Sequence, residues 1–191
     1  APEDVDPAFW MPAANTIAEY QLADIILLNG AGYAKWVSKV SLPRRKLVNT
    51  SQAFKDDYIT IDTAVKHQHG PAGDHSHAGV AFTTWMDLKQ AALQAEQIAS
   101  AMKKARPELA QLFDDNYFQL KKELLQLDKK VSDVTTRKPG IPLLASHPVY
   151  QYLARRYNLN IRSLMWEPGV YPDAASWQNL NNKLRKQAAA W

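Results

Sequence analysis

The stretch PELAQLFDDNYFQLKKELLQLDKKVSDV, residues 107–134, carries the longest helical pattern in the chain and contains no internal glycine or proline. Its apolar residues recur at intervals of three and four, the period of an amphipathic helix: Leu109, Leu112, Phe113, Tyr117, Leu120, Leu124, Leu127 and Val131. Such a helix is roughly 40 Å long at about 1.5 Å per residue, which is more than a small lobe needs. The pattern therefore predicts one continuous helix that bridges two lobes.

Short apolar runs on both sides of this helix predict small parallel sheets. The strand candidates are residues 24–29, 46–49, 141–145 and 161–166. Helical patterns alternate with them, and this alternation is typical of an α/β fold. We expect an N-terminal α/β lobe at 1–106, a linking helix at 107–134, and a partial C-terminal α/β lobe at 135–191.

The composition excludes several classes of protein. The 191 residues include no cysteine, which excludes a disulfide scaffold, a thiolate zinc finger and a cysteine nucleophile. No apolar run reaches the length of about 18 residues that a membrane span requires, and the first residues, APEDVDP, do not form a signal peptide. The net charge of +4 is spread along the chain, so we expect no nucleic-acid partner.

Four of the five histidines lie in one glycine-rich segment, residues 66–79, which we expect to be a loop. They form two His-x-His pairs around a Gly-Pro-Ala-Gly-Asp bend: His67, His69, His75 and His77. Residues two apart in an extended chain lie on the same side, and neutral imidazole is a good ligand for Zn²⁺, Cu²⁺ and Ni²⁺. The segment is either a metal-binding loop or a solvated loop without a physiological ligand.

The fifth histidine, His147, follows the strand candidate at 141–145 and precedes Pro148, where a helical pattern begins. Ligands of parallel α/β sheets bind at the carboxyl ends of the strands, so this position favours a ligand. It equally suits a histidine that caps the N–H groups at the start of the helix. Position alone leaves both interpretations open.

Catalytic motifs are missing from the sequence. The segment Gly30-Ala31-Gly32 lacks the remaining residues of a phosphate-binding loop, and there is no Gly-x-Ser-x-Gly elbow. A metal-dependent hydrolase would need three converging ligands and a general base, and the sequence shows neither. We therefore predict that the protein is not an enzyme.

Five segments, taken in order, resemble the zinc/manganese solute-binding proteins of bacterial ABC transporters: LADIILLNGAGYAKWV, the histidine-rich loop, TTWMDLKQAALQAEQIASAM, ARPELAQLFDDNYFQLKKELLQLD and SHPVYQYLARRYNLNI. The resemblance covers roughly residues 5–168. It implies two α/β lobes joined by a rigid helix, with metal held between the lobes, in a chain incomplete at both ends. It also implies a monomeric periplasmic or extracytoplasmic receptor that delivers its metal to a membrane permease.

The resemblance also implies four ligand positions, of which this chain keeps one. The position after an Asp-Pro pair is Ala8, the position before the Trp-x-Asp motif is Thr83, His147 matches the third, and the segment of the fourth is absent. A zinc site needs three or four protein ligands. We therefore predict a non-standard site in which His147 is joined by one or more of the loop histidines His67, His69, His75 and His77. Glu167 is a secondary ligand candidate.

Zn²⁺ is the expected metal because imidazole nitrogen dominates this ligand set and no soft ligand is present. Mn²⁺, Cu²⁺ and Ni²⁺ are alternatives. An alternative function keeps the fold and uses a degenerate cleft to bind a metal chelate or a small organic solute. The walls of that cleft would be Trp10, Trp85 and Trp166.

Overall fold

The computed structural model describes residues 5, 7–61, 66–68, 74–76, 79–164, 166 and 171–187, with backbone alone at 66–68, 74–76, 186 and 187. The chain divides into two compact units. The first comprises Ala1–Tyr58 and Leu88–Gln126, and the second comprises Ile59–Asp87 and Leu127–Trp191. The boundaries expected from the sequence are 1–106, 107–134 and 135–191. They assign residues 59–87 to the N-terminal lobe, whereas the structure groups these residues with the second unit. The lobe boundaries stay a prediction.

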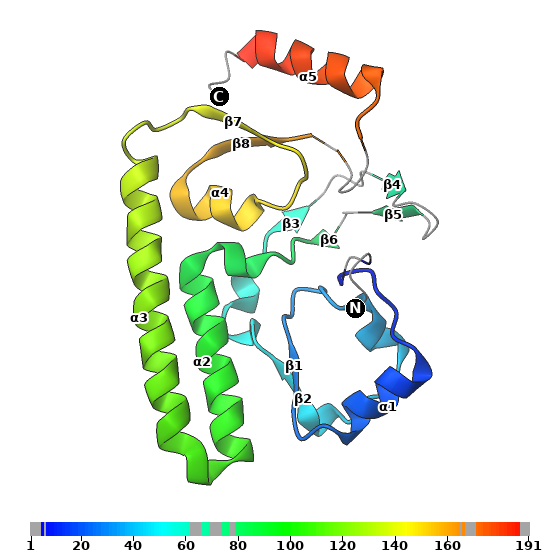
Figure 1. Cartoon of the computed structure of the whole chain (residues 1–191), viewed down its shortest axis with the longest axis vertical. Helices are drawn as coiled ribbons and strands as arrows, with labels where there is room; N and C mark the ends of the chain where they lie inside the picture. Colours follow the sequence, from blue (N-terminus) through cyan, green and yellow to red (C-terminus); the bar gives the residue numbers. More distant parts are fainter. Residues whose placement is uncertain are drawn as a thin grey trace. The chain divides into compact units, whose positions relative to one another are not determined.

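The first unit contains a parallel pair of short strands, β1 (Ile26–Leu28) and β2 (Leu47–Asn49), with Ile26 opposite Leu47 (Figure 1). Both strands lie within the predicted runs 24–29 and 46–49. The helices of this unit are α1 (Ala14–Leu22), α2 (Leu88–Ala105) and the 3₁₀ helices Lys35–Lys39, Arg44–Lys46 and Gln52–Asp57. The strands are short, so side chains from these helices make up much of the core.

Trp36 lies at one centre of this core and is 5% exposed. Its ring centroid lies 5.0 Å from that of Tyr20 on α1 and 6.3 Å from that of Trp10. Aromatic pairs at these separations stabilise a core beyond the area they bury. Trp10 therefore packs inside the first unit.

The second unit contains another parallel pair, β7 (Pro142–Ala145) and β8 (Asn160–Ser163), in the register Pro142 opposite Asn160. The predicted strands at 141–145 and 161–166 are therefore present. Helices of this unit include α4 (Gln151–Tyr157), α5 (Ala174–Gln187) and the 3₁₀ helix Thr84–Met86. Helix α4 connects β7 to β8, as in a parallel crossover.

The expectation of a loop at residues 66–79 is wrong in part, because the segment contains strands. β4 (Lys66–Gln68) pairs antiparallel with β5 (Asp74–Ser76), and β3 (Thr60–Ile61) pairs antiparallel with β6 (Gly79–Val80). We call this segment, from β3 to β6, the histidine hairpin. Its ladders are two or three residues long, and β4 and β5 consist of polar residues, so no apolar alternation was available to indicate a strand.

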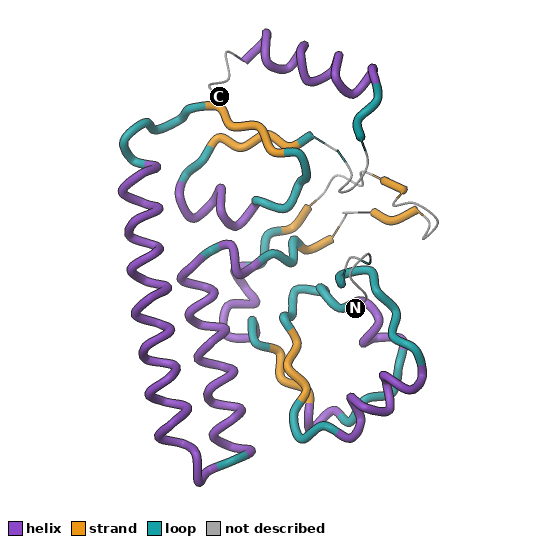
Figure 2. The backbone as a smooth tube through the Cα atoms, in the orientation of Figure 1, coloured by secondary structure: helices purple, strands orange, loops and turns teal. Residues whose placement is uncertain are grey.

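The predicted long helix is confirmed. The 3₁₀ turn Pro107–Leu109 leads directly into α3 (Ala110–Thr135), which is the long helix in Figure 2. Its residues up to Gln126 belong to the first unit, and those from Leu127 belong to the second. Among the described residues, no helix is both long enough and apolar enough to cross a membrane.

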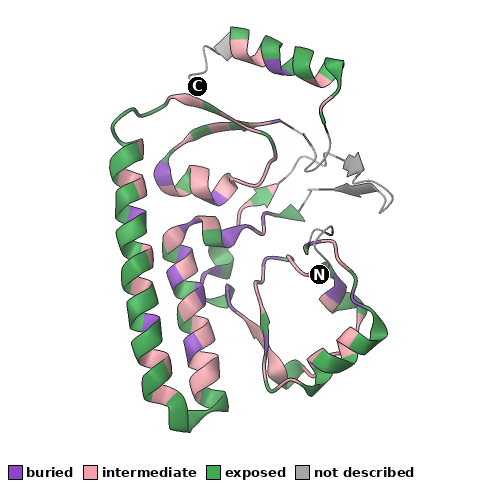
Figure 3. Ribbon diagram, viewed as in Figure 1, coloured by how far each residue is buried: buried purple, intermediate pink, exposed green. Residues whose placement is uncertain are grey.

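Part of the predicted apolar series on α3 is exposed. Leu112, Leu120 and Leu127 are 52%, 45% and 47% exposed, whereas Tyr117, from the same series, is 8% exposed and Asp128 is 7% exposed. Figure 3 shows the helix as mostly exposed, with isolated buried positions. The three–four period thus predicted the helix and the burial of Tyr117, but not the burial of Asp128.

A buried ion pair fastens α4 to the second half of α3. Arg156 donates from Nε to Oδ1 of Asp128 at 2.8 Å and from Nη2 to Oδ2 at 2.5 Å. The hydroxyl of Tyr157 donates to the same carboxylate at 2.9 Å. Burial, followed by the hydrogen bond to Asp128, raises the pKa of Tyr157, so this hydroxyl remains a donor at neutral pH. Two-pronged contacts of this kind fix orientation as well as distance.

Replacing Asp128 with alanine should lower the free energy of unfolding by about 3 kcal/mol, because it removes the acceptor of the buried Tyr157 hydroxyl and leaves the Arg156 guanidinium with only the more distant Asp87, at 3.7 Å. The matched control is Asp133→Ala on the same helix, which breaks an exposed pair with Lys129 and should cost less than about 0.5 kcal/mol. Urea denaturation of the two variants measures the difference. Equal losses in both would contradict a structural role for the buried pair.

Candidate metal site

His147 lies at the carboxyl ends of β7 and β8. The strand β7 ends at Ala145, and the segments that follow β7 and β8 remain hydrogen-bonded to each other beyond this point. The N–H of Leu164 donates to the carbonyl of Ala145 at 2.7 Å, and the N–H of Trp166 donates to the carbonyl of Ser146 at 2.9 Å. The fold therefore places His147 at the sheet edge where ligands of parallel α/β sheets bind.

A hydrogen bond fixes the chemistry of the His147 ring. Its Nδ1 lies 3.1 Å from the carbonyl oxygen of Trp166. A carbonyl oxygen only accepts hydrogen bonds, so Nδ1 carries the proton and the lone pair of the neutral ring is on Nε2. Histidines that bind metals commonly donate their other ring N–H to a backbone carbonyl in this way. The half-buried ring therefore has the tautomer that a metal ligand needs.

The alternative role for His147, as the cap of the following helix, does not match its position. Helix α4 begins at Gln151, and its N-cap residue is Tyr150, which makes no capping hydrogen bond through its side chain. The Nδ1 atom of His147 donates to the carbonyl of Trp166 and therefore caps no N–H group of the helix. The position of His147 therefore favours the ligand interpretation.

The histidine hairpin brings two of the loop histidines to opposite positions. In the β4–β5 ladder, His67 pairs with His75, between the pairs Lys66–Ser76 and Gln68–Asp74. The structure gives the backbone of His67 and His75, while His69, His77 and Glu167 lie outside the described residues. The predicted ligand set thus stays a prediction, with a defined register for two of its members.

The family positions occupied by Ala8 and Thr83 serve the fold. Ala8 is fully buried in the first unit. The hydroxyl of Thr83 donates to the carbonyl of Val149 at 2.6 Å, and Thr83 is 7% exposed. Within the part of the chain that the structure describes, no three histidine, aspartate or glutamate residues form a group that could hold a metal ion.

The three tryptophans predicted to line a cleft for an organic solute belong to different units. Trp10 is in the first unit, whereas Trp85 and Trp166 are in the second. Trp166 packs edge-on against Trp177, with ring centroids 5.0 Å apart. Trp85 is 39% exposed. The contacts of Trp10 and Trp166 are therefore packing contacts within their own units.

A buried polar cluster at the carboxyl ends of β1 and β2 was not predicted from the sequence. Gln94 on α2 donates to the hydroxyl of Thr50 at 2.9 Å and to the side-chain oxygen of Asn29 at 3.0 Å. Ser51 and Tyr58 share a hydrogen bond of 2.5 Å. Only amides and hydroxyls take part in these contacts, and they bond to one another. The cluster thus stabilises the strand ends and offers no strong metal ligand.

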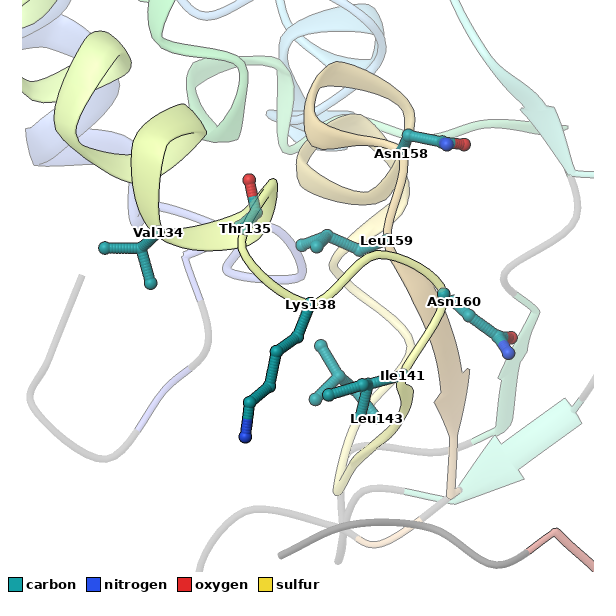
Figure 4. Close-up of a pocket in the computed structure, with 9 residues that line it drawn as sticks. Val134, Thr135, Lys138, Ile141, Leu143, Asn158, Leu159 and Asn160 are labelled. Atoms are coloured by element: carbon teal, nitrogen blue, oxygen red, sulfur yellow. The ribbon is translucent and has the colours of Figure 1, made fainter.

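A pocket of about 240 Å³ lies at the opposite end of the β7–β8 sheet from His147 (Figure 4). Its lining is mainly apolar and comes from the end of α3, from β7 and from the turn before β8: Val134, Thr135, Lys138, Gly140, Ile141, Leu143, Asn158, Leu159 and Asn160. In Figure 4 the side chains of Asn158 and Asn160 point away from the apolar group. None of the predicted metal ligands contributes to this pocket.

Comparison with known proteins gives one family. The family model described as zinc-uptake complex component A, periplasmic, matches residues 1–190. The zinc-binding protein AdcA of Streptococcus pyogenes serotype M6 is 26% identical over 181 residues, covering 88% of this chain and 34% of that protein. A putative metal-binding protein of Chlamydia muridarum is 34% identical over 74 residues, covering 39% of this chain and 27% of that protein.

Solved structures share the fold. The metal-dependent lipoprotein YcdH of Bacillus subtilis has a TM-score of 0.78 at 20% identity, covering 99% of this chain and 66% of that one. Zn(II)-bound AdcA of Streptococcus pneumoniae has a TM-score of 0.74 at 20% identity, covering 97% of this chain and 38% of that one. The chain spans about a third of the length of the AdcA protein of S. pyogenes. The predicted α/β fold with a long linking helix is confirmed by these structures.

The hydrogen bond to Trp166 predicts the tautomer of His147 in the metal-free protein. In its neutral form the ring should carry its proton on Nδ1, the nitrogen that donates to the Trp166 carbonyl. Long-range ¹H–¹⁵N NMR spectra distinguish the two ring nitrogens directly, and His147→Ala assigns the signal. A ring protonated on Nε2 would contradict the assignment of Nε2 as the metal-binding atom.

Proposed function

The chain belongs to the family of the periplasmic component A of zinc-uptake complexes, and we propose that it is an extracytoplasmic metal receptor. It captures a divalent transition metal, Zn²⁺ in the first instance, and delivers it as cargo to the membrane permease of an ABC transporter. It acts as a monomer and catalyses no reaction. The observation that carries this proposal is the Nδ1 hydrogen bond of His147 at the carboxyl edge of the sheet.

The proposed role of His147 follows from its fixed ring. A ligand that already has the correct tautomer and orientation loses little freedom when the metal binds. The contact from Nδ1 to the Trp166 carbonyl also makes Nε2 a stronger base, as outer-shell acceptors do for metal-bound histidines. His147 is therefore the first ligand in the proposal, and its Nε2 binds the cargo.

The histidine hairpin supplies the further ligands in the proposal. His67 and His75 are directly opposite in the β4–β5 ladder, and opposite residues of an antiparallel pair have Cβ atoms about 4.5–5.5 Å apart. Two imidazoles at that separation suit one Zn²⁺ ion, for which Zn–N distances are about 2.0–2.1 Å. Together with His147 they complete a three-nitrogen set. His69, His77 and Glu167 are the reserve ligands of this proposal.

Zinc titration by competition with a chromophoric chelator tests the proposal. His147→Ala should raise the zinc Kd by about a hundredfold, since a site of four ligands is worth about 10–16 kcal/mol in total. Ser146→Ala, an exposed neighbour in the same turn, is the matched control and should leave the Kd unchanged. The double variant His67→Ala/His75→Ala should also weaken binding.

Equal zinc affinities of the wild type, His147→Ala and the double hairpin variant would contradict the proposed site. Absence of zinc binding to the wild type, combined with binding of a metal chelate or an organic solute, would favour the alternative receptor function. Thermal melts with chelator and with excess zinc provide a second readout, because a ligand that binds only the folded state raises its melting temperature.

The proposed ligands also predict a pH dependence. Imidazole binds metal only when it is neutral, so protons compete with Zn²⁺ as the pH falls through the ordinary histidine pKa of about 6.5. The zinc affinity should therefore decrease by about a hundredfold or more between about pH 7 and about pH 5. Isothermal titration at several pH values measures this change together with the protons released. A flat profile would show that the ligands are not imidazoles.

A further inference from the structure

Tyr152 on α4 is fully buried, and its hydroxyl bonds to two backbone segments that are distant in sequence. It accepts a hydrogen bond from the N–H of Ile59 at 3.2 Å and donates one to the carbonyl of Ala81 at 2.9 Å. Breaking either bond would leave a buried polar group without a hydrogen-bond partner and without access to water, which costs free energy. The Tyr152 hydroxyl therefore links α4 to both segments at once.

The two bonded segments are the arms of the histidine hairpin at its base. Ile59 directly precedes β3 and Ala81 directly follows β6, and the N–H of Ala81 donates to the carbonyl of Ile59 at 2.8 Å. The β3–β6 ladder continues this pairing, and β4 and β5 lie between these two strands in the sequence. The Tyr152 hydroxyl thus holds the hairpin at the point where it leaves the body of the second unit.

A second link joins the same arm to the segment that carries His147. The Thr83 hydroxyl, two residues beyond Ala81, donates to the carbonyl of Val149 at 2.6 Å. Val149 lies between His147 and α4, and its own N–H donates to the carbonyl of His147 at 3.1 Å. Both links therefore run from the hairpin base to the segment that follows His147, one at Val149 and one on α4.

We propose that Tyr152 is a positioning residue for metal binding: its hydroxyl fixes the base of the histidine hairpin on α4 and thereby sets His67 and His75 relative to His147. This inference rests on the proposed function. A tethered base leaves the hairpin fewer orientations, so less conformational entropy is lost when its histidines and His147 bind one ion. Thr83 acts in the same way through its bond to Val149.

Tyr157 provides a matched control for this role. It lies on the same helix, is 8% exposed, and its hydroxyl donates to Asp128 at 2.9 Å. Tyr157→Phe therefore removes a buried hydroxyl of the same kind, from a contact with α3. Tyr152→Phe keeps the ring in the core and removes only the two bonds to the hairpin arms. Both variants should lower the melting temperature by a few degrees.

The experiment measures the zinc Kd of both tyrosine variants in two backgrounds, wild type and His67→Ala/His75→Ala. In the wild-type background Tyr152→Phe should raise the Kd about fivefold, the equivalent of one net hydrogen bond of about 1 kcal/mol. In the hairpin-histidine background it should have no effect. Tyr157→Phe should leave the Kd unchanged in both backgrounds. Amide hydrogen exchange at Ile59 should accelerate in Tyr152→Phe and not in Tyr157→Phe.

Three results would overturn the inference. A Kd that Tyr152→Phe leaves unchanged, with zinc binding still dependent on His147 and on the hairpin histidines, would refute the positioning role and leave the proposed function intact. An equal weakening in both backgrounds would show that Tyr152 does not act through the hairpin. A zinc Kd that depends on none of the histidines would refute the proposed function and the inference together. Thr83→Val repeats the test if Tyr152→Phe does not fold, and it should weaken zinc binding in the wild-type background only.

Discussion

The buried carboxylate of Asp128 is the interaction on which the second unit depends. It accepts two hydrogen bonds from Arg156 and one from Tyr157, and these contacts hold the short helix α4 against α3. A seven-residue helix has little stability of its own, so α4 needs such contacts. The same helix bonds to the hairpin arms through Tyr152 and begins at Gln151, shortly after His147. The stability of the second unit thus depends on a charge pair outside the candidate site.

Local sequence patterns predict some of the helices and strands of this chain, but not all of them and not how they pack. The helix at 107–135 and the strands β1, β2, β7 and β8 could be predicted, because each has a clear apolar period or an apolar run ended by a turn residue. The histidine hairpin could not, because its strands are two or three residues long and show no apolar alternation. The burial of Asp128 on α3 was equally hidden, since its partners come from α4, which is distant in sequence.

The candidate site was predictable to a similar degree. His147 could be placed at a sheet edge from the apolar strand before it, and the hydrogen bond to Trp166 adds the tautomer, which no sequence pattern contains. Thr83, which the resemblance places at a ligand position, donates to the carbonyl of Val149, and no sequence pattern indicates this contact. The roles of Tyr152 and Gln94 depend on partners far along the chain, and a single sequence offers no signal for such pairs.

The central claim is that imidazole nitrogens of His147 and of the histidine hairpin hold the metal. Zinc K-edge X-ray absorption of the loaded protein tests it most directly, because the outer-shell scattering of imidazole rings distinguishes them from carboxylates and water. The account predicts a first shell at about 2.0–2.1 Å with the scattering of three imidazole rings, reduced by one ring in His147→Ala. A first shell of oxygen without imidazole scattering would contradict it.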